Sequence, residues 1–443
     1  MKDLNKFFYP KKIAIIGASE KEGSVGRTVI KNLEHFSGEK YYINPGHTKI
    51  FKKKAYKSIT EIKDVDLAII VTPAKAVFSV VQEISKTNCK NILMMTAGFD
   101  EVGNSNLSLE IKKILDKNKI NLIGPNCLGI LNLENNLDAT FNSRDKLDLP
   151  KSGNVSILSQ SGALGVALLD LASFENLKIN KFISYGNALD VDESDLLEYL
   201  GKDKNTDVIL CYIEGIKNGS KFLNTLKKTT TKKKVIILKG GVSQKGSTAV
   251  KSHTAAIAGS SEVFFSAIDQ FGAYSVDSIK DLFNLAKVFS KYKNTKIKDV
   301  QIITNGGGFG VLSTDQLDLN NISLSSLSKE TTNKIKNIVP DYAVIKNPID
   351  LTGDADNKRF IETIKYCLTD KSVSAIALLI LFQLPAIDES IITDLKKLSS
   401  KKPIFVLAIG GKKTKDIIYK IENNGFICFS DPKDLAKTLS IIK

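Results

Sequence analysis

The chain has 443 residues, 42% of them hydrophobic, which is too long for one ordinary domain and predicts two or three. Its formal net charge of +15 comes from lysines spread over predicted surface helices without interleaved aromatic residues. This favours a solvated basic surface or a polyanionic small ligand over a nucleic-acid site. No apolar run is long enough to span a membrane, and residues 1–10 do not resemble a signal peptide.

Short β-branched runs alternate with helical stretches from end to end, which predicts an α/β fold of three Rossmann- or flavodoxin-like domains with mostly parallel sheets. Polar linkers at 142–152 and 291–298 separate the domains, and we expect their limits at 1–143, 144–295 and 296–443. The expected strands are 12–16, 41–44, 67–71, 92–95 and 120–123 in the first domain, 154–158, 182–184, 208–213 and 235–238 in the second, and 300–303, 375–381 and 404–407 in the third.

The first strand runs into a glycine-rich turn, Gly17-Ala18-Ser19-Glu20-Lys21-Glu22-Gly23-Ser24-Val25-Gly26, which a helix follows. Such turns hold phosphate, because glycine lets the backbone approach and the helix N-terminus favours anions. The spacing is not G-x-G-x-x-G, and the second strand ends in Asn44-Pro45 without the acid that an NAD ribose requires. We therefore predict a ligand with further phosphates, such as CoA. The alternative is a tight turn that binds nothing.

Two features of the second domain suit phosphoryl chemistry. Ser159-Gln160-Ser161-Gly162 follows a strand and opens a helix, so free N–H groups and two hydroxyls form a candidate phosphate seat. A simple N-cap at Ser161 is compatible with that role. Glu214 ends the predicted strand 208–213, at the edge where α/β sheets carry functional groups. The alternative to a functional role for Glu214 is a solvated acid at a strand end.

His253 is one of only three histidines and lies in a small, hydroxyl-rich segment, residues 251–259, before an apolar helical run. We expect a loop there, with Ser252 and Thr254 as good capping residues and a helix N-terminus that favours anions. An imidazole in this setting could meet a phosphate. The alternative is a helix-capping loop whose histidine is incidental. His35 and His47 receive no role.

The cysteines and the acidic stretch at 190–195 are interpreted as structural. The five cysteines show no paired or metal-type spacing, which predicts a reducing cytoplasm and no zinc. Cys127 has no basic partner nearby and is interpreted as packing. The acidic stretch 190–195 suits a helix start, with a metal site as the alternative. We predict no metal site in this chain.

Ten short motifs follow one another along the chain. They are Gly17-Ala18-Ser19, Asn44-Pro45, Val71-Thr72-Pro73-Ala74, Thr96-Ala97-Gly98-Phe99, Gly124-Pro125-Asn126-Cys127-Leu128-Gly129, Ser159-Gln160-Ser161-Gly162, Tyr212-Ile213-Glu214-Gly215, Ser252-His253-Thr254, Thr304-Asn305-Gly306-Gly307-Gly308 and Asn347-Pro348-Ile349-Asp350-Leu351-Thr352-Gly353. Taken in order, these motifs resemble those of a known family, the α subunits of the NDP-forming acyl-CoA synthetases. These are the ADP-forming acetyl-CoA synthetases, relatives of succinyl-CoA synthetase. The last two motifs make the third domain similar to the extra domain of the ADP-forming branch, and the resemblance spans nearly the whole chain.

The resemblance implies a reaction and a set of roles. Acyl-CoA, ADP and phosphate are interconverted with acid, CoA and ATP through an acyl phosphate and a phosphohistidine. By motif the histidine is His253 and its carboxylate partner is Glu214. The acyl or phosphoryl group is implied to contact Ser159, Gln160, Ser161, Gly162 and Asn126. CoA is implied to contact Gly17, Ala18, Ser19, Gly23, Ser24, Val25, Gly26, Asn44, Pro45, Thr72 and Pro73.

The sequence contains neither a P-loop nor an ATP-grasp pattern. The resemblance therefore implies a separate ATP-grasp β subunit that binds ADP or ATP with Mg²⁺, in an α₂β₂ heterotetramer, and a short acyl substrate such as acetate. A non-catalytic CoA-binding regulatory protein of the same fold is the main alternative, but it could dispense with His253 and Glu214. An NAD-dependent dehydrogenase would need an acid after the second strand and a base in the second domain, and neither is seen.

Overall fold

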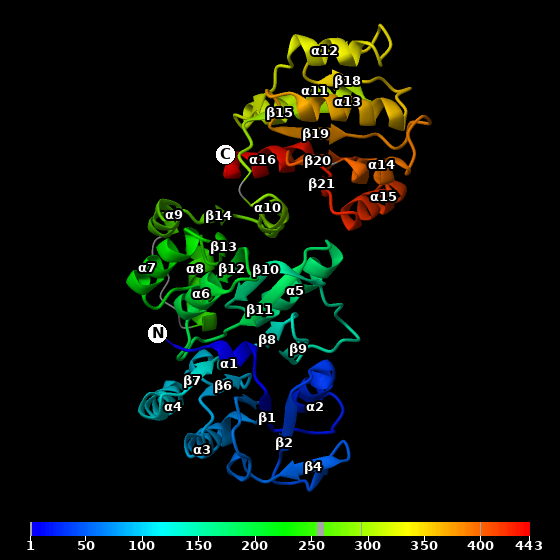
Figure 1. Cartoon of the computed structure of the whole chain (residues 1–443). Coiled ribbons are helices and arrows are strands. Elements are labelled where there is room, and N and C mark those ends of the chain that lie inside the picture. Colours follow the sequence, from blue (N-terminus) through cyan, green and yellow to red (C-terminus); the bar gives the residue numbers. More distant parts are fainter. Residues whose placement is uncertain (1, 255–260, 294, 399) are drawn as a thin grey trace. The chain divides into compact units, whose positions relative to one another are not determined.

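A computed structural model describes residues 2–254, 261–293, 295–398 and 400–443, with 251–254 given as backbone only (Figure 1). The chain separates into two compact units, Met1–Ala286 and Lys287–Lys443. The first unit contains two of the predicted sheets and the second unit contains the third. Within the described residues no helix is both long and apolar enough to cross a membrane.

The first sheet is parallel except for one short hairpin strand. Its strands are β1 (Lys12–Ile16), β2 (Glu39–Ile43), β3 (Lys49–Ile50), β4 (Lys53–Tyr56), β5 (Leu67–Ile70), β6 (Asn91–Met94) and β7 (Asn121–Ile123). Its helices are α1 (Asn5–Phe8), α2 (Val25–Asn32), α3 (Ala74–Ser85) and α4 (Ser105–Asn118), with 3₁₀ turns η1 (Leu33–His35), η2 (Ile59–Glu61) and η3 (Asp100–Val102). The order is β3-β4-β2-β1-β5-β6-β7, and only β3 is antiparallel to its neighbour.

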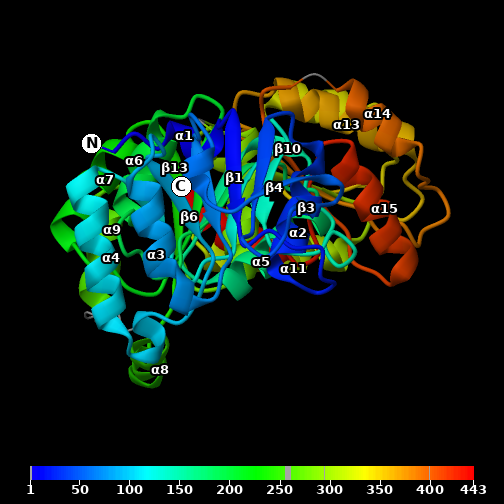
Figure 2. The ribbon, with the colours of Figure 1, turned by 90° about the horizontal axis from the view of Figure 1, so that it is seen from below.

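The apolar runs of the central strands are buried on both faces, as parallel strands under helices require. Ile13 and Ile15 of β1 share a core with the α2 residues Val29 and Ile30, whereas the alternate residue Ile16 packs with α3 and α4. Figure 2 shows α2 on one side of β1 and the pair α3 and α4 on the other. The period-2 pattern of the strand therefore distributes the helices over the two faces.

The second sheet has the order β14-β13-β12-β10-β11-β8-β9. Its strands are β8 (Gly129–Asn132), β9 (Leu137–Thr140), β10 (Ser152–Ser159), β11 (Ile179–Ser184), β12 (Val208–Ile213), β13 (Lys234–Lys239) and β14 (Tyr274–Val276). Its helices are α5 (Gly162–Phe174), α6 (Glu193–Lys202), α7 (Gly219–Thr230), α8 (Gln244–Thr254), α9 (Ser261–Gln270) and α10 (Ile279–Lys291). The strands β10 to β14 are parallel, and β8 and β9 form an antiparallel edge hairpin.

That hairpin departs from the organisation expected from the sequence. The expected first domain, 1–143, includes β8 and β9, yet β8 pairs with β11 and so extends the second sheet. Asn132, a buried residue of β8, also donates its amide to the carbonyl of Phe8 at 3.0 Å. The hairpin thus joins the edge of the second sheet to the N-terminal segment, and the first sheet ends at Ile123.

The third sheet forms the second unit, with the order β17-β18-β15-β19-β20-β21 and β16 beside β15. Its strands are β15 (Asp299–Thr304), β16 (Ser323–Leu324), β17 (Val344–Ile345), β18 (Ile349–Asp350), β19 (Ala375–Leu379), β20 (Ile404–Leu407) and β21 (Ile427–Phe429). Its helices are α11 (Gly307–Leu319), α12 (Lys329–Lys336), α13 (Asn357–Thr369), α14 (Ile391–Lys397), α15 (Lys412–Asn423) and α16 (Pro432–Ile442). Two separate apolar cores lie on its two faces. The predicted α/β class with mostly parallel sheets is confirmed.

Within the first unit, the loops after β7 and β11 are joined through their backbones. The amide N–H groups of Asn187, Leu189 and Val191 donate to the carbonyls of Pro125, Gly124 and Leu122, each at 3.0 Å. Gly186 has φ +56°, and a Cβ there would lie 2.3 Å from the carbonyl oxygen of Pro125. Because both strands end at these loops, the carboxyl edges of the first two sheets meet here, and the candidate site lies at this meeting.

Candidate active site

The glycine loop after β1 is packed closely on its own helix. Gly17 has φ +96°, and a Cβ on Gly26, inside α2, would lie 2.2 Å from the carbonyl oxygen of Gly17. Ser24 is the N-cap of α2, because its hydroxyl accepts the N–H of Arg27 at 3.3 Å. The loop therefore requires glycine at both positions, and α2 begins at Val25 with its N-terminus directed toward the loop.

Neighbouring strand ends connect to this loop by hydrogen bonds. Asn44, after β2, donates its amide to the carbonyl of Ala18 at 2.9 Å. Thr96, after β6, donates its hydroxyl to the carbonyl of Thr72 at 2.7 Å. The buried hydroxyl of Thr72 has no hydrogen-bond partner among the described residues. A buried polar atom of this kind is free for a ligand, so the edge from Gly17 to Thr72 fits a phosphate-bearing ligand such as CoA.

The phosphate seat that the sequence predicts at residues 159–162 has the expected local form. Ser161 is the N-cap of α5, and its hydroxyl accepts the N–H of Leu164 at 3.3 Å. Ser159 is buried and donates its hydroxyl to the carbonyl of Ser161 at 2.6 Å. Both hydroxyls therefore shape the turn, and the backbone N–H groups of Gly162 and Ala163, at the start of α5, are what the turn offers to an anion.

Gln160 and Glu214 are brought together across two neighbouring strands. The amide oxygen Oε1 of Gln160 accepts the backbone N–H of Glu214 at 2.7 Å and that of Gly215 at 3.1 Å. The hydroxyl of the fully buried Tyr185 lies 3.5 Å from the same oxygen. Gln160 thus holds the turn that carries Glu214 beside the N-terminus of α5.

The carboxylate of Glu214 is oriented by the strand before it. Tyr212 donates its hydroxyl to Oε1 of Glu214 at 3.2 Å, and burial together with this acid raises the pKa of Tyr212 to about 12. Lys239, at the end of β13, donates to the backbone carbonyl of Glu214 at 2.7 Å, and burial lowers the pKa of Lys239. The side chain and the backbone of Glu214 are therefore each held by a separate neighbouring group.

The segment around His253 differs from the sequence prediction. Residues 251–254 form the last turn of α8 and not a loop. Hydroxyl residues occur inside this helix, because one turn earlier Thr248 donates its hydroxyl to the carbonyl of Gln244 at 3.1 Å and does not cap the helix. Helix α8 lies beside η3. The side chain of His253 and residues 255–260 lie outside what the structure describes, and the contact of His253 with Glu214 stays a prediction.

Asn126 lies in the loop after β7 with φ +55° and belongs to a polar contact that the sequence did not suggest. Its Nδ2 donates to Oδ1 of Asn187 at 3.3 Å, and Nδ2 of Asn187 donates to Oε2 of Glu101 at 2.6 Å. The Gly-Asn pair after the predicted strand 182–184 was a usable signal for Asn187, because that strand ends at the same edge as Glu214. No sequence signal marked Glu101.

The alternative reactive groups have structural roles. Cys127 is buried and donates its thiol to the carbonyl of Met94 at 3.3 Å, and burial raises its pKa to about 12. Asp192 and Asp195 form a capping box at the start of α6, and Lys221 pairs with both. The described part of the chain holds no cluster of three metal-ligating side chains. All five cysteines are free and buried.

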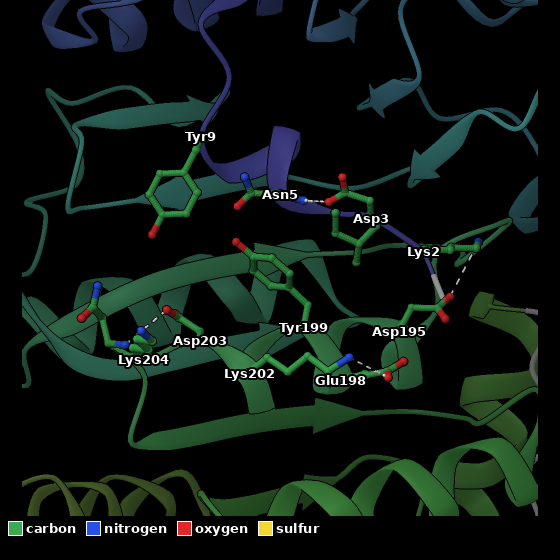
Figure 3. Close-up of a pocket in the computed structure, with 12 residues that line it drawn as sticks. Lys2, Asp3, Asn5, Tyr9, Asp195, Glu198, Tyr199, Lys202, Asp203 and Lys204 are labelled. Atoms are coloured by element: carbon green, nitrogen blue, oxygen red, sulfur yellow. Dashed lines mark hydrogen bonds and ion pairs between the residues drawn. The ribbon is translucent and has the colours of Figure 1, made fainter.

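A polar cavity of about 560 Å³ lies at the opposite edge of the strands, between the N-terminal segment and α6 (Figure 3). Its charges are largely paired, for example Lys202 with Glu198 at 3.0 Å and Lys2 with Asp195 at 3.6 Å. The lining residue Asp203 precedes β12, whereas Glu214 follows it. This cavity is therefore remote from the candidate active site.

Family models match three consecutive parts of the chain. A CoA binding domain matches residues 11–132, a succinyl-CoA ligase like flavodoxin domain matches 152–289, and a ligase-CoA domain matches 300–393. The order of the three matches follows the order of the three sheets.

Similar proteins are named as acetate–CoA ligases. The α subunit of ADP-forming acetate–CoA ligase II of Pyrococcus furiosus is 37% identical, with 98% of this chain and 96% of that protein covered. The ADP-forming acetate–CoA ligase of Methanocaldococcus jannaschii is 44% identical over 80% of this chain, and the chain spans half of that protein's length. Among solved structures, the dinucleotide-forming acetyl-coenzyme A synthetase 1 of Ca. Korarchaeum cryptofilum, in complex with phosphate and ADP, matches with a TM-score of 0.93, 33% identity and coverage of 100% of this chain and 96% of that one.

Proposed function

This chain belongs to the family of the ADP-forming acetate–CoA ligase α subunits, and we propose that it is the α subunit of an acyl-CoA synthetase. The enzyme interconverts acyl-CoA, ADP and phosphate with the free acid, CoA and ATP. The proposed acyl group is a short one, such as acetyl. The observation that carries the proposal is the contact of Gln160 with the Glu214 turn, which joins that turn to the residue just before the N-cap of α5.

The proposed reaction proceeds in balanced steps. A phosphate oxygen attacks the thioester carbon, the C–S bond breaks, and the CoA thiol leaves with an acyl phosphate as the other product. One imidazole nitrogen of His253 then attacks phosphorus, and the acid leaves as the P–O bond breaks. Glu214 accepts a hydrogen bond from the other ring nitrogen and stabilises the cation formed. The N–H groups at the start of α5 hold the phosphoryl oxygens. An oxygen of ADP finally takes the phosphoryl group.

The proposal includes a partner chain. The nucleotide, with Mg²⁺, binds to an ATP-grasp β subunit, and the assembly is α₂β₂. Support comes from the lengths of the relatives, because this chain spans nearly all of the Pyrococcus α subunit but only half of the Methanocaldococcus protein. The proposed location is the cytoplasm, which the five free, buried cysteines support.

Two other functions fit the geometry less well. A regulatory protein that only binds CoA would have no use for an acid whose carboxylate accepts from Tyr212 and whose backbone is held by Gln160 and Lys239. A dehydrogenase requires an acid at the end of β2 for the ribose hydroxyls of NAD. There the chain has Asn44, whose amide is engaged with the carbonyl of Ala18.

The test is transient phosphorylation of His253. Incubation with radiolabelled acetyl phosphate should label the chain, and brief acid treatment should remove the label, because phosphohistidine is acid-labile. His253→Ala should abolish labelling, and Glu214→Gln should slow it by about 10²-fold, the contribution of a typical positioned catalytic group. The exposed His35 in η1 provides the matched control, since His35→Ala should label normally. An acid-stable label, or undiminished labelling of His253→Ala, would refute the phosphohistidine mechanism.

A further inference from the structure

Three side chains form a continuous row where the first two sheets meet. Glu101 comes from η3 of the CoA-binding part, Asn126 from the loop after β7, and Asn187 from the loop after β11. Oε2 of Glu101 accepts from Nδ2 of Asn187 at 2.6 Å, and Oδ1 of Asn187 accepts from Nδ2 of Asn126 at 3.3 Å. The row therefore begins at a carboxylate and ends at an amide.

Glu101 fixes which way both amides face. Its other oxygen, Oε1, accepts the backbone N–H groups of Gly98 and Phe99. Burial opposes ionisation, but these hydrogen bonds and that of Asn187 outweigh it and lower the pKa of Glu101. An ionised carboxylate can only accept, so Asn187 must present its NH₂ to Glu101 and its oxygen to Asn126. Asn126 must then donate its own NH₂ to Asn187, so that its oxygen Oδ1 faces away from Asn187.

The backbone holds this row in place. Lys217 donates to the carbonyls of Asn187 and Ala188 at 2.8 and 2.9 Å. The N–H of Asn187 donates to the carbonyl of Pro125, and the N–H of Asn126 donates to the carbonyl of Thr96 at 2.9 Å. Within the described part of the chain no group donates to Oδ1 of Asn126. Asn126 thus offers a fixed, unused acceptor.

The position of this acceptor relative to the glycine loop suggests what it meets. Along the carboxyl edge the order is β1, β5, β6, β7, so Asn126 lies three strand spacings of about 4.8 Å, or about 14 Å in all, from Gly17. Thr72 and Thr96 lie between them. A ligand whose phosphates sit at the glycine loop and whose extended arm follows this edge would bring its far end to Asn126.

We propose that Oδ1 of Asn126 accepts a hydrogen bond from the cysteamine end of CoA, and that Glu101 and Asn187 are positioning residues that set this polarity. The inference rests on the proposed function. The cysteamine end carries two donors, the amide N–H and the thiol S–H. Acyl carbonyl and phosphoryl oxygens are themselves acceptors, so an exposed amide oxygen does not suit them. This changes the role that the resemblance implies for Asn126, from the acyl or phosphoryl group to the thiol end of CoA.

The row predicts an unusual effect of one conservative change. In Glu101→Gln, the side-chain oxygen of the new glutamine can still accept from Gly98 and Phe99, so its NH₂ must face Asn187. Asn187 would then turn its oxygen to that NH₂ and its own NH₂ to Asn126, and Asn126 would expose NH₂ in place of oxygen. The substitution therefore reverses the polarity at the far end of the row without removing a contact.

The test is calorimetric binding of CoA and two analogues. One analogue replaces the cysteamine amide N–H by an ester oxygen, and the other, desulfo-CoA, lacks the thiol. One of the two analogues lacks the group that donates to Asn126. The unsubstituted protein should bind CoA about tenfold more tightly than that analogue, which corresponds to the free energy of one ordinary hydrogen bond. Which analogue is weakened identifies the donor. In Glu101→Gln the affinities for CoA and for that analogue should differ by no more than about twofold.

Asn187→Leu is the second variant. It removes the contact that orients Asn126 and should also abolish the preference, while Glu110→Gln, on the exposed side of α4, should keep it. Equal binding of CoA and both analogues by the unsubstituted protein would overturn the inference, as would a full preference in Glu101→Gln. If CoA itself does not bind, the proposed function fails instead, so the two failures are distinguishable.

Discussion

The contact between Gln160 and the Glu214 turn gives a prediction that separates structure from chemistry. In Gln160→Ala, the backbone N–H groups of Glu214 and Gly215 lose their acceptor, which now lies at 2.7 and 3.1 Å. An unsatisfied buried donor costs about 1–3 kcal/mol. The two donors together would cost about 2–6 kcal/mol. Because Glu214 is partly exposed and water can reach its N–H, we expect a total near the lower end of this sum, about 2–3 kcal/mol. In a unit of this size that lowers the unfolding midpoint by roughly 4–10 °C.

Gln160→Glu should behave differently. A carboxylate accepts both N–H groups through charge-assisted hydrogen bonds, so stability should stay within about 1 kcal/mol of the unsubstituted protein. The substitution also removes the NH₂ donor of Gln160 and adds a negative charge beside Glu214 and the N-terminus of α5. We therefore expect a KM for phosphate about 10- to 100-fold higher, the cost of one hydrogen bond to a charged group, with CoA binding unchanged.

Scanning calorimetry measures the first effect, and phosphate-dependent release of thiol from acetyl-CoA measures the second. If Gln160→Ala unfolds at the same temperature as the unsubstituted protein, its amide oxygen does not hold the Glu214 turn. If Gln160→Glu retains the KM for phosphate, Gln160 is not part of the phosphate seat and serves only the fold.

Two further predictions concern stability. Burial raises the pKa of Glu193 to about 7 from an ordinary 4.5. Between these two pH values the folded state binds more protons than the unfolded state, so the free energy of unfolding falls as pH rises from about 4.5 to 7. Glu193→Gln should remove this fall and be more stable by up to about 3 kcal/mol at pH 8 in urea unfolding, and parallel pH profiles of the two proteins would contradict this. Gly186→Ala adds a Cβ 2.3 Å from the carbonyl oxygen of Pro125 at φ +56° and should lower the free energy of unfolding by about 2–4 kcal/mol, whereas an unchanged urea midpoint would show that the two loops can separate freely.

The sequence alone determined the features that depend on short-range patterns. Continuous apolar runs such as 67–70 predicted buried parallel strands, because a strand covered on both faces has no polar side. The sequence offered an N-cap at Ser161 as an interpretation compatible with a phosphate seat, and its hydroxyl does accept the N–H of Leu164. Glu214 was predicted at a carboxyl strand end, where it lies. Each of these follows from neighbours within a few residues along the chain.

Only the tertiary structure decided which strand ends meet. The runs that become β8 and β9 have the same local pattern whichever sheet they join, and pairing with β11 places them in the second. The last turn of α8 likewise lies where a loop was expected. Serine and threonine occur both at helix caps and inside helices, so the residue types alone do not decide between the two. Local composition does not resolve such choices, since they depend on packing against distant elements.

The polar contacts of the site illustrate the same limit at the level of single atoms. Glu214 and Gln160 are 54 residues apart, Asn187 and Asn126 are 61, and Asn187 and Glu101 are 86. A glutamine or asparagine can donate or accept, so its residue type leaves open which atom faces a ligand. That choice is made by the group at the other end of the contact, here the carboxylate of Glu101, and the fold alone brings that group into reach.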